Sequence, residues 1–148
     1  MTLTSKRRFS FEEMSPQYNL PQLTTEINGV KLSDILQTIN DRIEVLLNKD
    51  NLIGHSYFLK VDSEAALKDT IFKNILPLLQ EYFFGDYGKI GLVMGKGFIK
   101  EEKERKKVSF SAFDYPDTEG VQKTIYELRK YDEVIIKDAI KLLLNEKS

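Results

Sequence analysis

An apolar stripe between residues 32 and 47 constrains the fold of this 148-residue chain more than any other feature. Its members recur at steps of three and four, the spacing that places side chains on one face of an α-helix. Ser33 or Asp34 can serve near the N-cap, and residues 48–51 followed by Gly54 end the pattern. The stripe predicts an amphipathic helix and consists of Leu32, Ile35, Leu36, Ile39, Ile43, Leu46 and Leu47.

Further helices are predicted after this stripe. A second helical stretch runs from about Ser63 to Lys73. Pro77 then restarts a short helix that ends at Gly85, because proline is accepted in a first helical turn but not in a helix interior. The segment EVIIKDAIKLLLNE predicts a closing helix, whose apolar face carries Ile136, Ala139, Ile140 and Leu143.

Strands are predicted to be few and short. The segment RRFSFEEM at residues 7–14 has Phe9 and Phe11 on one face, which suggests a strand without a partner in this chain. It resembles the last strand of a sheet whose other strands are missing. The segment VSFSAF at residues 108–113 also alternates, and residues 124–131 are a weaker strand candidate. The predicted fold class is therefore mainly α, of the α+β kind.

Composition excludes several classes of function. Lysine and arginine number 22 against 23 acidic residues, so no global basic field attracts nucleic acid or an anionic membrane. The absence of cysteine excludes disulfides, thiolate metal sites and a cysteine nucleophile. No apolar run approaches the ~20 residues of a membrane span, and the first 16 residues lack the apolar core of a signal peptide. We therefore expect a cytoplasmic protein without membrane contact.

The glycine-rich segment GDYGKIGLVMGKGFI at residues 85–99 suggests a phosphate loop, but its spacing does not fit one. That motif needs four residues between its glycines and then Lys-Ser or Lys-Thr. Gly91 and Gly95 are separated by three residues, and Lys96 is followed by Gly97. No hydroxyl is placed to hold magnesium, so the segment favours a turn followed by a short apolar segment.

His55, the single histidine, lies in the segment Gly-His-Ser-Tyr-Phe that follows the first helix. Carboxylates at metal-ligand spacing are missing beside it, so no metal site is predicted. Ser56 is adjacent in sequence and lacks a nucleophile elbow, so the two residues do not form a nucleophile–base pair. The residues alone favour a hydrogen-bonded packing histidine over a catalyst.

Two cationic segments are candidate phosphate sites. Arg7 and Arg8 open the predicted strand at residues 7–14, where they are either a surface pair or a phosphate-recognition pair, since guanidinium groups match phosphate oxygens. Residues 100–107, KEEKERKK, mix signs and favour a solvated loop or hairpin tip. Direct nucleic-acid binding is therefore not expected, and a weak nucleic-acid-binding module at residues 96–107 is the minority alternative.

Three segments together resemble the C-terminal end of McrB-type proteins, the AAA+ GTPase subunits of methylcytosine-dependent restriction systems. They are KRRFSFEEMSP, ILQTINDRIEVLLNKDNLIGHSYFLKV and ILPLLQEYFFGDYGKIGLVMG, and they occur in the expected order over residues 6–99. The resemblance implies that residues 1–24 are a remnant of an AAA+ core, residues 25–95 a helical lid, and residues 96–148 a strand-containing appendage with a terminal helix.

The resemblance also implies roles for particular residues. Arg8 and Arg7 match an arginine segment whose side chains are expected to reach the nucleotide of a neighbouring subunit, and so to act in catalysis in trans. Gly54, His55 and Ser56 would form a lid corner near the nucleotide, with His55 as a positioning group. GTP or ATP and magnesium are implied only for a complete motor, together with a McrC-type nuclease subunit as partner.

The chain departs from the family by lacking its phosphate loop, its magnesium-binding acidic segment and its DNA-reading domain. Phosphoryl transfer depends on positioning and charge neutralisation by such elements, so we expect no nucleotide hydrolysis by this chain alone. The predicted function is the lid part of a restriction NTPase, from a truncated or split gene product. The alternative is a free-standing interaction module that caps or modulates an AAA+ ring.

Overall fold

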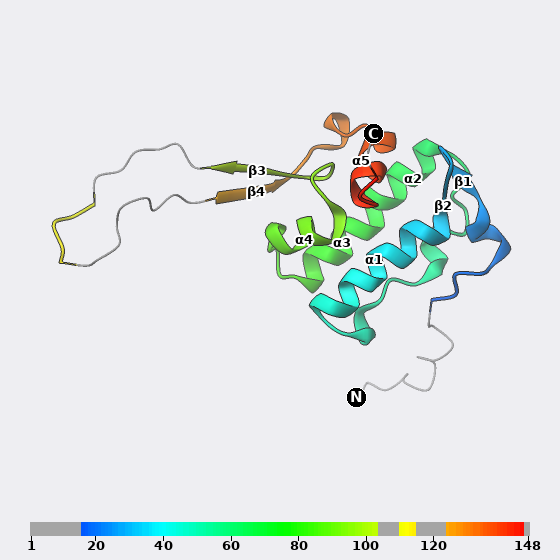
Figure 1. Cartoon of the computed structure of the whole chain (residues 1–148), viewed down its shortest axis with the longest axis horizontal. Coiled ribbons are helices and arrows are strands. Elements are labelled where there is room, and N and C mark those ends of the chain that lie inside the picture. Colours follow the sequence, from blue (N-terminus) through cyan, green and yellow to red (C-terminus); the bar gives the residue numbers. More distant parts are fainter. Residues whose placement is uncertain (1–15, 104–109, 115–123, 147–148) are drawn as a thin grey trace.

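A computed structural model describes residues 16–103, 110–114 and 124–146 of the chain. The strand predicted at residues 7–14, with Arg7 and Arg8, lies outside these residues. The described elements form a mainly helical body from which a two-stranded ribbon projects (Figure 1). No helix among them is both long enough and apolar enough to cross a membrane.

Helix α1 (Leu32–Leu46) confirms the helix predicted from the apolar stripe. Leu32, Ile35, Leu36, Ile39 and Ile43 are fully buried in the core, while Leu46 and Leu47 are half-buried. The expected cap is wrong, because Lys31 occupies the N-cap position and makes no side-chain capping bond. A short hairpin ends where α1 begins, so the entry into the helix is fixed by strand pairing.

That hairpin consists of β1 (Glu26–Ile27) and β2 (Val30–Lys31), paired antiparallel with Ile27 opposite Val30. The two connecting residues have positive φ angles, +55° at Asn28 and +81° at Gly29. Two-residue hairpin turns of this mirror-image kind favour Asn-Gly, because both residues tolerate the left-handed region. The Asn-Gly pair is the signal for a hairpin that the sequence analysis did not predict.

The next three segments, α2 (Glu64–Thr70), a π-helical turn (Ile71–Ile75) and α3 (Leu76–Tyr82), follow one another without interruption. The amide of Leu76 bonds the carbonyl of Ile71, five residues back. Pro77 has no N–H, and its ring clashes with the carbonyl four residues earlier in a regular α-helix. The wider π turn relieves that clash, so the helix continues through Pro77 where a break was predicted.

Helix α4 (Tyr87–Met94) occupies most of the glycine-rich segment, where a turn and a short apolar segment were predicted. Asp86 caps it by accepting a hydrogen bond from the amide of Lys89 at 3.2 Å. The glycines of α4 lie under the ribbon. A Cβ on Gly88 would stand 3.3 Å from the Tyr126 ring, and one on Gly91 would stand 3.5 Å from Ile99. These glycines therefore provide close packing in place of a phosphate site.

The projecting ribbon is formed by β3 (Ile99–Lys103) and β4 (Thr124–Leu128), paired antiparallel with Ile99 opposite Leu128. Strand β4 confirms the weaker strand candidate. Strand β3 corrects the view of residues 100–107 as a loop or hairpin tip, at least for residues 100–103. Residues 110–114 are not a strand, so the prediction for residues 108–113 is wrong over its described part.

Helix α5 (Ile136–Leu143) confirms the predicted closing helix. Its predicted apolar face is buried in the same cluster as the stripe of α1. Gly97 shows how closely the chain leading into the ribbon approaches this helix, since a Cβ there would lie 2.6 Å from the Cα of Ala139. The body around α1 therefore includes α5, which comes from the region predicted to be an appendage.

Candidate functional site

The predicted lid corner, Gly54, His55 and Ser56, opens a 3₁₀ turn (His55–Phe58) after α1. The turn is anchored by Phe58, which is fully buried, while Ser56 is exposed and His55 is half-buried. We call these three residues the His55 corner. It is a loop held on the surface of the body by one aromatic anchor and by the bonds described next.

Asn40 is the one buried polar side chain among the described residues, with 1% of its surface exposed. Its Oδ1 accepts a hydrogen bond from the amide of Ile53 at 2.7 Å, and its Nδ2 donates to the carbonyl of Ile53 at 2.9 Å. The same Nδ2 donates to the hydroxyl of Tyr18 at 3.1 Å. Asn40 thus joins α1, the residue preceding the His55 corner, and the incoming N-terminal segment.

His55 makes a second tie to the N-terminal segment. Its Nδ1 accepts a hydrogen bond from the backbone amide of Gln17 at 3.2 Å. An accepting Nδ1 carries no proton, so the neutral ring holds its proton on Nε2. The 3₁₀ turn Pro21–Thr24 of this segment also contacts the His55 turn, and Leu23 is completely buried.

The hydrogen bond of His55 is made to the N-terminal segment. The bonded nitrogen faces backbone, and no hydrogen bond between His55 and Ser56 is present. Burial raises the pKa of Tyr18, while the hydrogen bond from Asn40 opposes that rise. The corner therefore holds residues 17–24 in place. Arg7 and Arg8, the predicted catalytic pair, lie upstream of this segment and outside the described residues.

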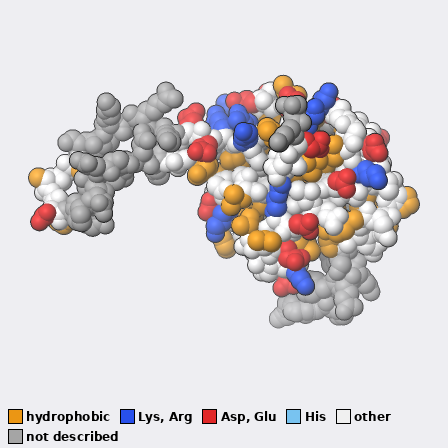
Figure 2. Space-filling view, in the orientation of Figure 1, with side chains coloured by type: hydrophobic (Ala, Val, Ile, Leu, Met, Phe, Trp, Pro, Cys, Tyr) orange, Lys and Arg blue, Asp and Glu red, His pale blue; other side chains and the backbone are white. Residues whose placement is uncertain are grey.

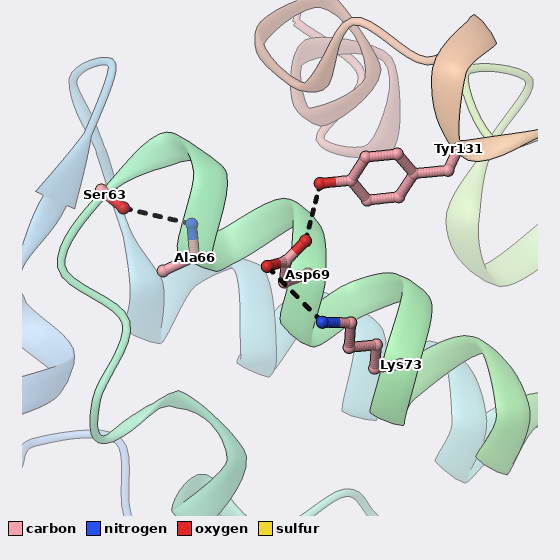
Figure 3. Close-up of polar contacts among 5 residues, drawn as sticks. All are labelled: Ser63, Ala66, Asp69, Lys73 and Tyr131. Carbon is pink, nitrogen blue, oxygen red and sulfur yellow. Dashed lines mark hydrogen bonds and ion pairs between the residues drawn. The ribbon is translucent and has the colours of Figure 1, made fainter.

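The C-terminal region is fastened to α2 through Tyr131, which follows β4 (Figure 3). Its hydroxyl donates to Asp69 at 2.6 Å, and Asp69 also lies 3.8 Å from Lys73. The Tyr131 ring packs edge-on against Phe72, with centroids 5.2 Å apart, and lies under the ammonium of Lys68. The hydrogen bond to Asp69 raises the pKa of Tyr131. These contacts hold the base of the ribbon against the long helix.

Metal chemistry has no site in the described part of the chain, where no three His, Asp or Glu side chains converge in a way that could hold an ion. Two basic residues at the ribbon base make local contacts. Arg129 donates to the carbonyl of Lys96 at 2.9 Å, and Lys100 pairs with Glu127 at 3.7 Å. The described residues therefore form a helical body to which the His55 corner is held by hydrogen bonds.

Two comparisons relate part of this body to known proteins. Residues 31–91 match the family described as "McrB, alpha-helical lid domain". This span runs from the last residue of the β1–β2 hairpin through most of α4, and it includes the His55 corner. Residues 31–91 form a McrB-type helical lid. The prediction drawn from the sequence resemblance is confirmed for this part of the chain.

The chain is also similar to the Type IV methyl-directed restriction enzyme EcoKMcrB subunit of Escherichia coli (strain K12). The two are 32% identical over 98 residues, which cover 55% of this chain. The chain spans about a fifth of the length of that relative, since the match covers 21% of it. The similarity relates this lid to one part of a restriction subunit.

Asn40 and Tyr18 were not predicted as site residues from the sequence. Asn40 lies four residues after Leu36 and three before Ile43, so it stands on the apolar face of α1. A polar residue at a predicted core position needs a hydrogen-bonding partner, and that is the signal that could have identified it. Tyr18 lies in an irregular segment between prolines, where no pattern indicates its partner.

Proposed function

We propose that this chain is the lid and arginine-bearing part of a McrB-like restriction NTPase, and that it does not hydrolyse nucleotide alone. The match of residues 31–91 to the McrB lid carries this proposal. The relative's name describes a methyl-directed restriction enzyme subunit, which supports a role in restriction. In a complete motor, the nucleotide would be GTP or ATP with magnesium, and a McrC-type nuclease subunit would be the partner.

Inertness follows from what phosphoryl transfer requires. A phosphate loop, a magnesium ligand and a positioned nucleophile stabilise the charge that develops in the transition state. The 148 residues contain no phosphate-loop motif. The proposal therefore assigns Arg8, with Arg7 as second candidate, to contact with a nucleotide held by a neighbouring subunit.

The tie between the N-terminal segment and the lid supports this assignment. Arg8 precedes Gln17 by nine residues, and Gln17 is bonded to the His55 corner. Nine extended residues span at most about 30 Å, so the lid limits how far the arginines can reach. The His55 corner would then set the starting point of the segment that carries Arg8.

Steady-state hydrolysis of GTP and ATP by the purified chain tests the first half of the proposal, and no turnover is expected. Turnover that disappears on mutation of His55 or Arg8 would place a complete site in this chain and overturn it. The second half is tested by grafting residues 1–95 into a complete family motor. Arg8→Ala should then reduce turnover by about 10³–10⁵, the usual range for arginines supplied in trans.

Nucleotide affinity of the grafted motor separates catalysis from folding. Arg8→Ala should change it little, because the contact strengthens mainly in the transition state. Arg8→Lys should not restore full turnover, since an ammonium lacks the planar fork. Unimpaired turnover in both Arg8→Ala and Arg7→Ala would leave the pair as ordinary surface residues.

A further inference from the structure

The ribbon of β3 and β4 has two outer edges, and they differ in how well they are protected from pairing with another strand. Strand β3 has the sequence IKEEK, in which four of the five side chains are charged, and Figure 2 shows blue and red side chains gathered where the ribbon leaves the body. Strand β4 has the sequence TIYEL, with one charge among five. Charged side chains discourage strand addition, whereas β-branched and aromatic side chains favour it. The edge of β4 is therefore the less protected of the two.

The hydrogen-bonding pattern of the ribbon shows which backbone groups of β4 face outward. The amide of Arg129 donates to the carbonyl of Phe98 at 2.7 Å, so these two residues form a hydrogen-bonded pair of the ladder. Such pairs alternate with non-hydrogen-bonded pairs along antiparallel strands. The amides and carbonyls of Thr124, Tyr126 and Leu128 therefore point away from β3, and they have no backbone partner in the part of the chain that the structure describes.

The other edge and one face of the ribbon are partly covered by the chain itself. At the edge of β3, the outward amide of Ile99 donates to the carbonyl of Gly95 at 3.1 Å. On one face, Ile99 and Tyr126 lie over the glycines of α4. Side chains alternate between the two faces of a strand, so Ile125 points away from α4, and 36% of its surface is exposed. The open parts of the ribbon are thus the edge of β4 and the face that carries Ile125.

A further strand can add at the edge of β4, and the simplest source is β4 of a second copy. An isolated two-stranded ribbon is marginally stable, and packing against a helix or pairing with more strands stabilises it. Helix α4 provides such packing along one face. Antiparallel pairing of β4 with its counterpart provides more strands, since a twofold axis brings the same edge of both copies together.

Three central registers of this pairing are available, with Ile125, Tyr126 or Glu127 on the twofold axis. With Glu127 on the axis, two like charges stand directly opposite each other, which is destabilising. With Tyr126 on the axis, each Ile125 faces a Glu127 carboxylate. With Ile125 on the axis, two apolar side chains meet in a non-hydrogen-bonded pair, where the strands approach most closely. The register centred on Ile125 is therefore the self-complementary one.

We propose that two copies of this chain pair through β4, antiparallel and about a twofold axis at Ile125, to form a four-stranded sheet. The backbone groups of Thr124 in each copy bond those of Tyr126 in the other. The contact is small because it covers one short strand, and small interfaces are weak. The dissociation constant should be on the order of 10 µM to 1 mM.

A charge exchange at Ile125 tests this pairing by sedimentation velocity of the full chain. The wild type should associate as its concentration rises. Ile125→Lys and Ile125→Glu each place like charges opposite each other on the axis, so each should weaken self-association by roughly tenfold. An equimolar mixture of the two variants should associate again, because each mixed pair places lysine opposite glutamate. The same exchange at Val45, which is 85% exposed on α1, should leave association unchanged.

The absence of cysteine from the chain allows a second test by disulfide cross-linking. In the proposed register, Ile125→Cys places two thiols in a non-hydrogen-bonded pair, whose Cα atoms, about 4.5 Å apart, are within the range that a disulfide spans. Oxidation should therefore link Ile125→Cys much faster than Val45→Cys, which reports random collision.

Three results would overturn the proposal. The first is a wild type that stays monomeric at about 1 mM. The second is a mixture of Ile125→Lys with Ile125→Glu that associates no better than either variant alone. The third is equal cross-linking of Ile125→Cys and Val45→Cys. The charge exchange does not depend on the stability of the single variants, because only a contact across the twofold axis makes their mixture differ from both.

Discussion

The His55 corner and the turn at residues 83–86, which we call the Phe84 corner, both follow a helix, but their side chains differ in how they contact the rest of the chain. At the His55 corner, polar groups are hydrogen-bonded within the chain. The Asn40 side chain bonds the amide and carbonyl of Ile53, and His55 accepts a hydrogen bond from the amide of Gln17. At the Phe84 corner, an aromatic ring stands 95% exposed on a backbone with φ +52°. The first turn is held by hydrogen bonds to other parts of the chain, whereas the side chain of the second turn is left exposed.

This difference separates residues whose side chains stabilise the fold from residues whose side chains do not. A buried, hydrogen-bonded group such as Asn40 stabilises the molecule, and the molecule loses stability when that group is removed. A strained and exposed group such as Phe84 lowers stability in the free molecule, so it should be improvable by mutation. The sign of the change in unfolding free energy on mutation therefore distinguishes the two turns.

Asn40→Leu should have the largest effect at the His55 corner. The change leaves the amide and carbonyl of Ile53 buried without their partners, and each unsatisfied group costs about 1–3 kcal/mol. We expect a loss of about 2–5 kcal/mol in the free energy of unfolding, measured by urea denaturation. Gln37→Leu, on the exposed side of the same helix, should change stability by less than about 0.5 kcal/mol.

Gly97→Ala tests whether the C-terminal region is part of the body. The new Cβ would lie 2.6 Å from backbone of α5, so the variant should lose about 1–3 kcal/mol of unfolding free energy. Gly91→Ala is the matched comparison, because its Cβ would make only ordinary contacts at 3.5 Å. Better helix propensity should stabilise that variant by about 0.5–1 kcal/mol. Equal effects would mean that α5 does not pack as described.

His55→Ala should lose about 0.5–1.5 kcal/mol, the usual net value of one hydrogen bond. The amide of Gln17 should also exchange its hydrogen faster, because its acceptor is gone. His55→Asn places a carbonyl oxygen near the former Nδ1 and should restore much of the protection. Protection of the Gln17 amide that survives in His55→Ala would show that the histidine does not hold the N-terminal segment.

The helical faces were predictable because their spacing is a local property of the sequence. The stripe of α1 and the apolar face of α5 were both identified residue by residue, and each of their central members is buried. The lid was recognisable because its segments occur in family order, and residues 31–91 confirm it. The placement of Gly54, His55 and Ser56 near a nucleotide comes from the same resemblance and stays a prediction.

What the sequence did not reveal depends on contacts between distant residues. The glycines of helix α4 pack closely against Tyr126 and Ile99, which come later in the chain. The helix continues through Pro77 because of a π turn, and no local sequence pattern predicts that turn. The positive φ of Phe84 was not predictable either, because the sequence places the glycine expected to adopt a positive φ one residue later, at Gly85.

The most direct test of the comparison is the unfolding free energy of Phe84→Gly beside that of Phe83→Gly. Phe83 is 4% exposed, so its replacement should cost about 3–5 kcal/mol. Phe84→Gly relieves about 1–2 kcal/mol of left-handed strain in the folded state. Glycine also makes the unfolded chain more flexible, which lowers the unfolding free energy by about 0.4–1 kcal/mol. We predict that urea denaturation at low protein concentration will show Phe84→Gly to be about 0.5–1 kcal/mol more stable than the wild type. A loss of stability in Phe84→Gly would show that this ring serves the fold, and it would contradict the distinction between the two corners.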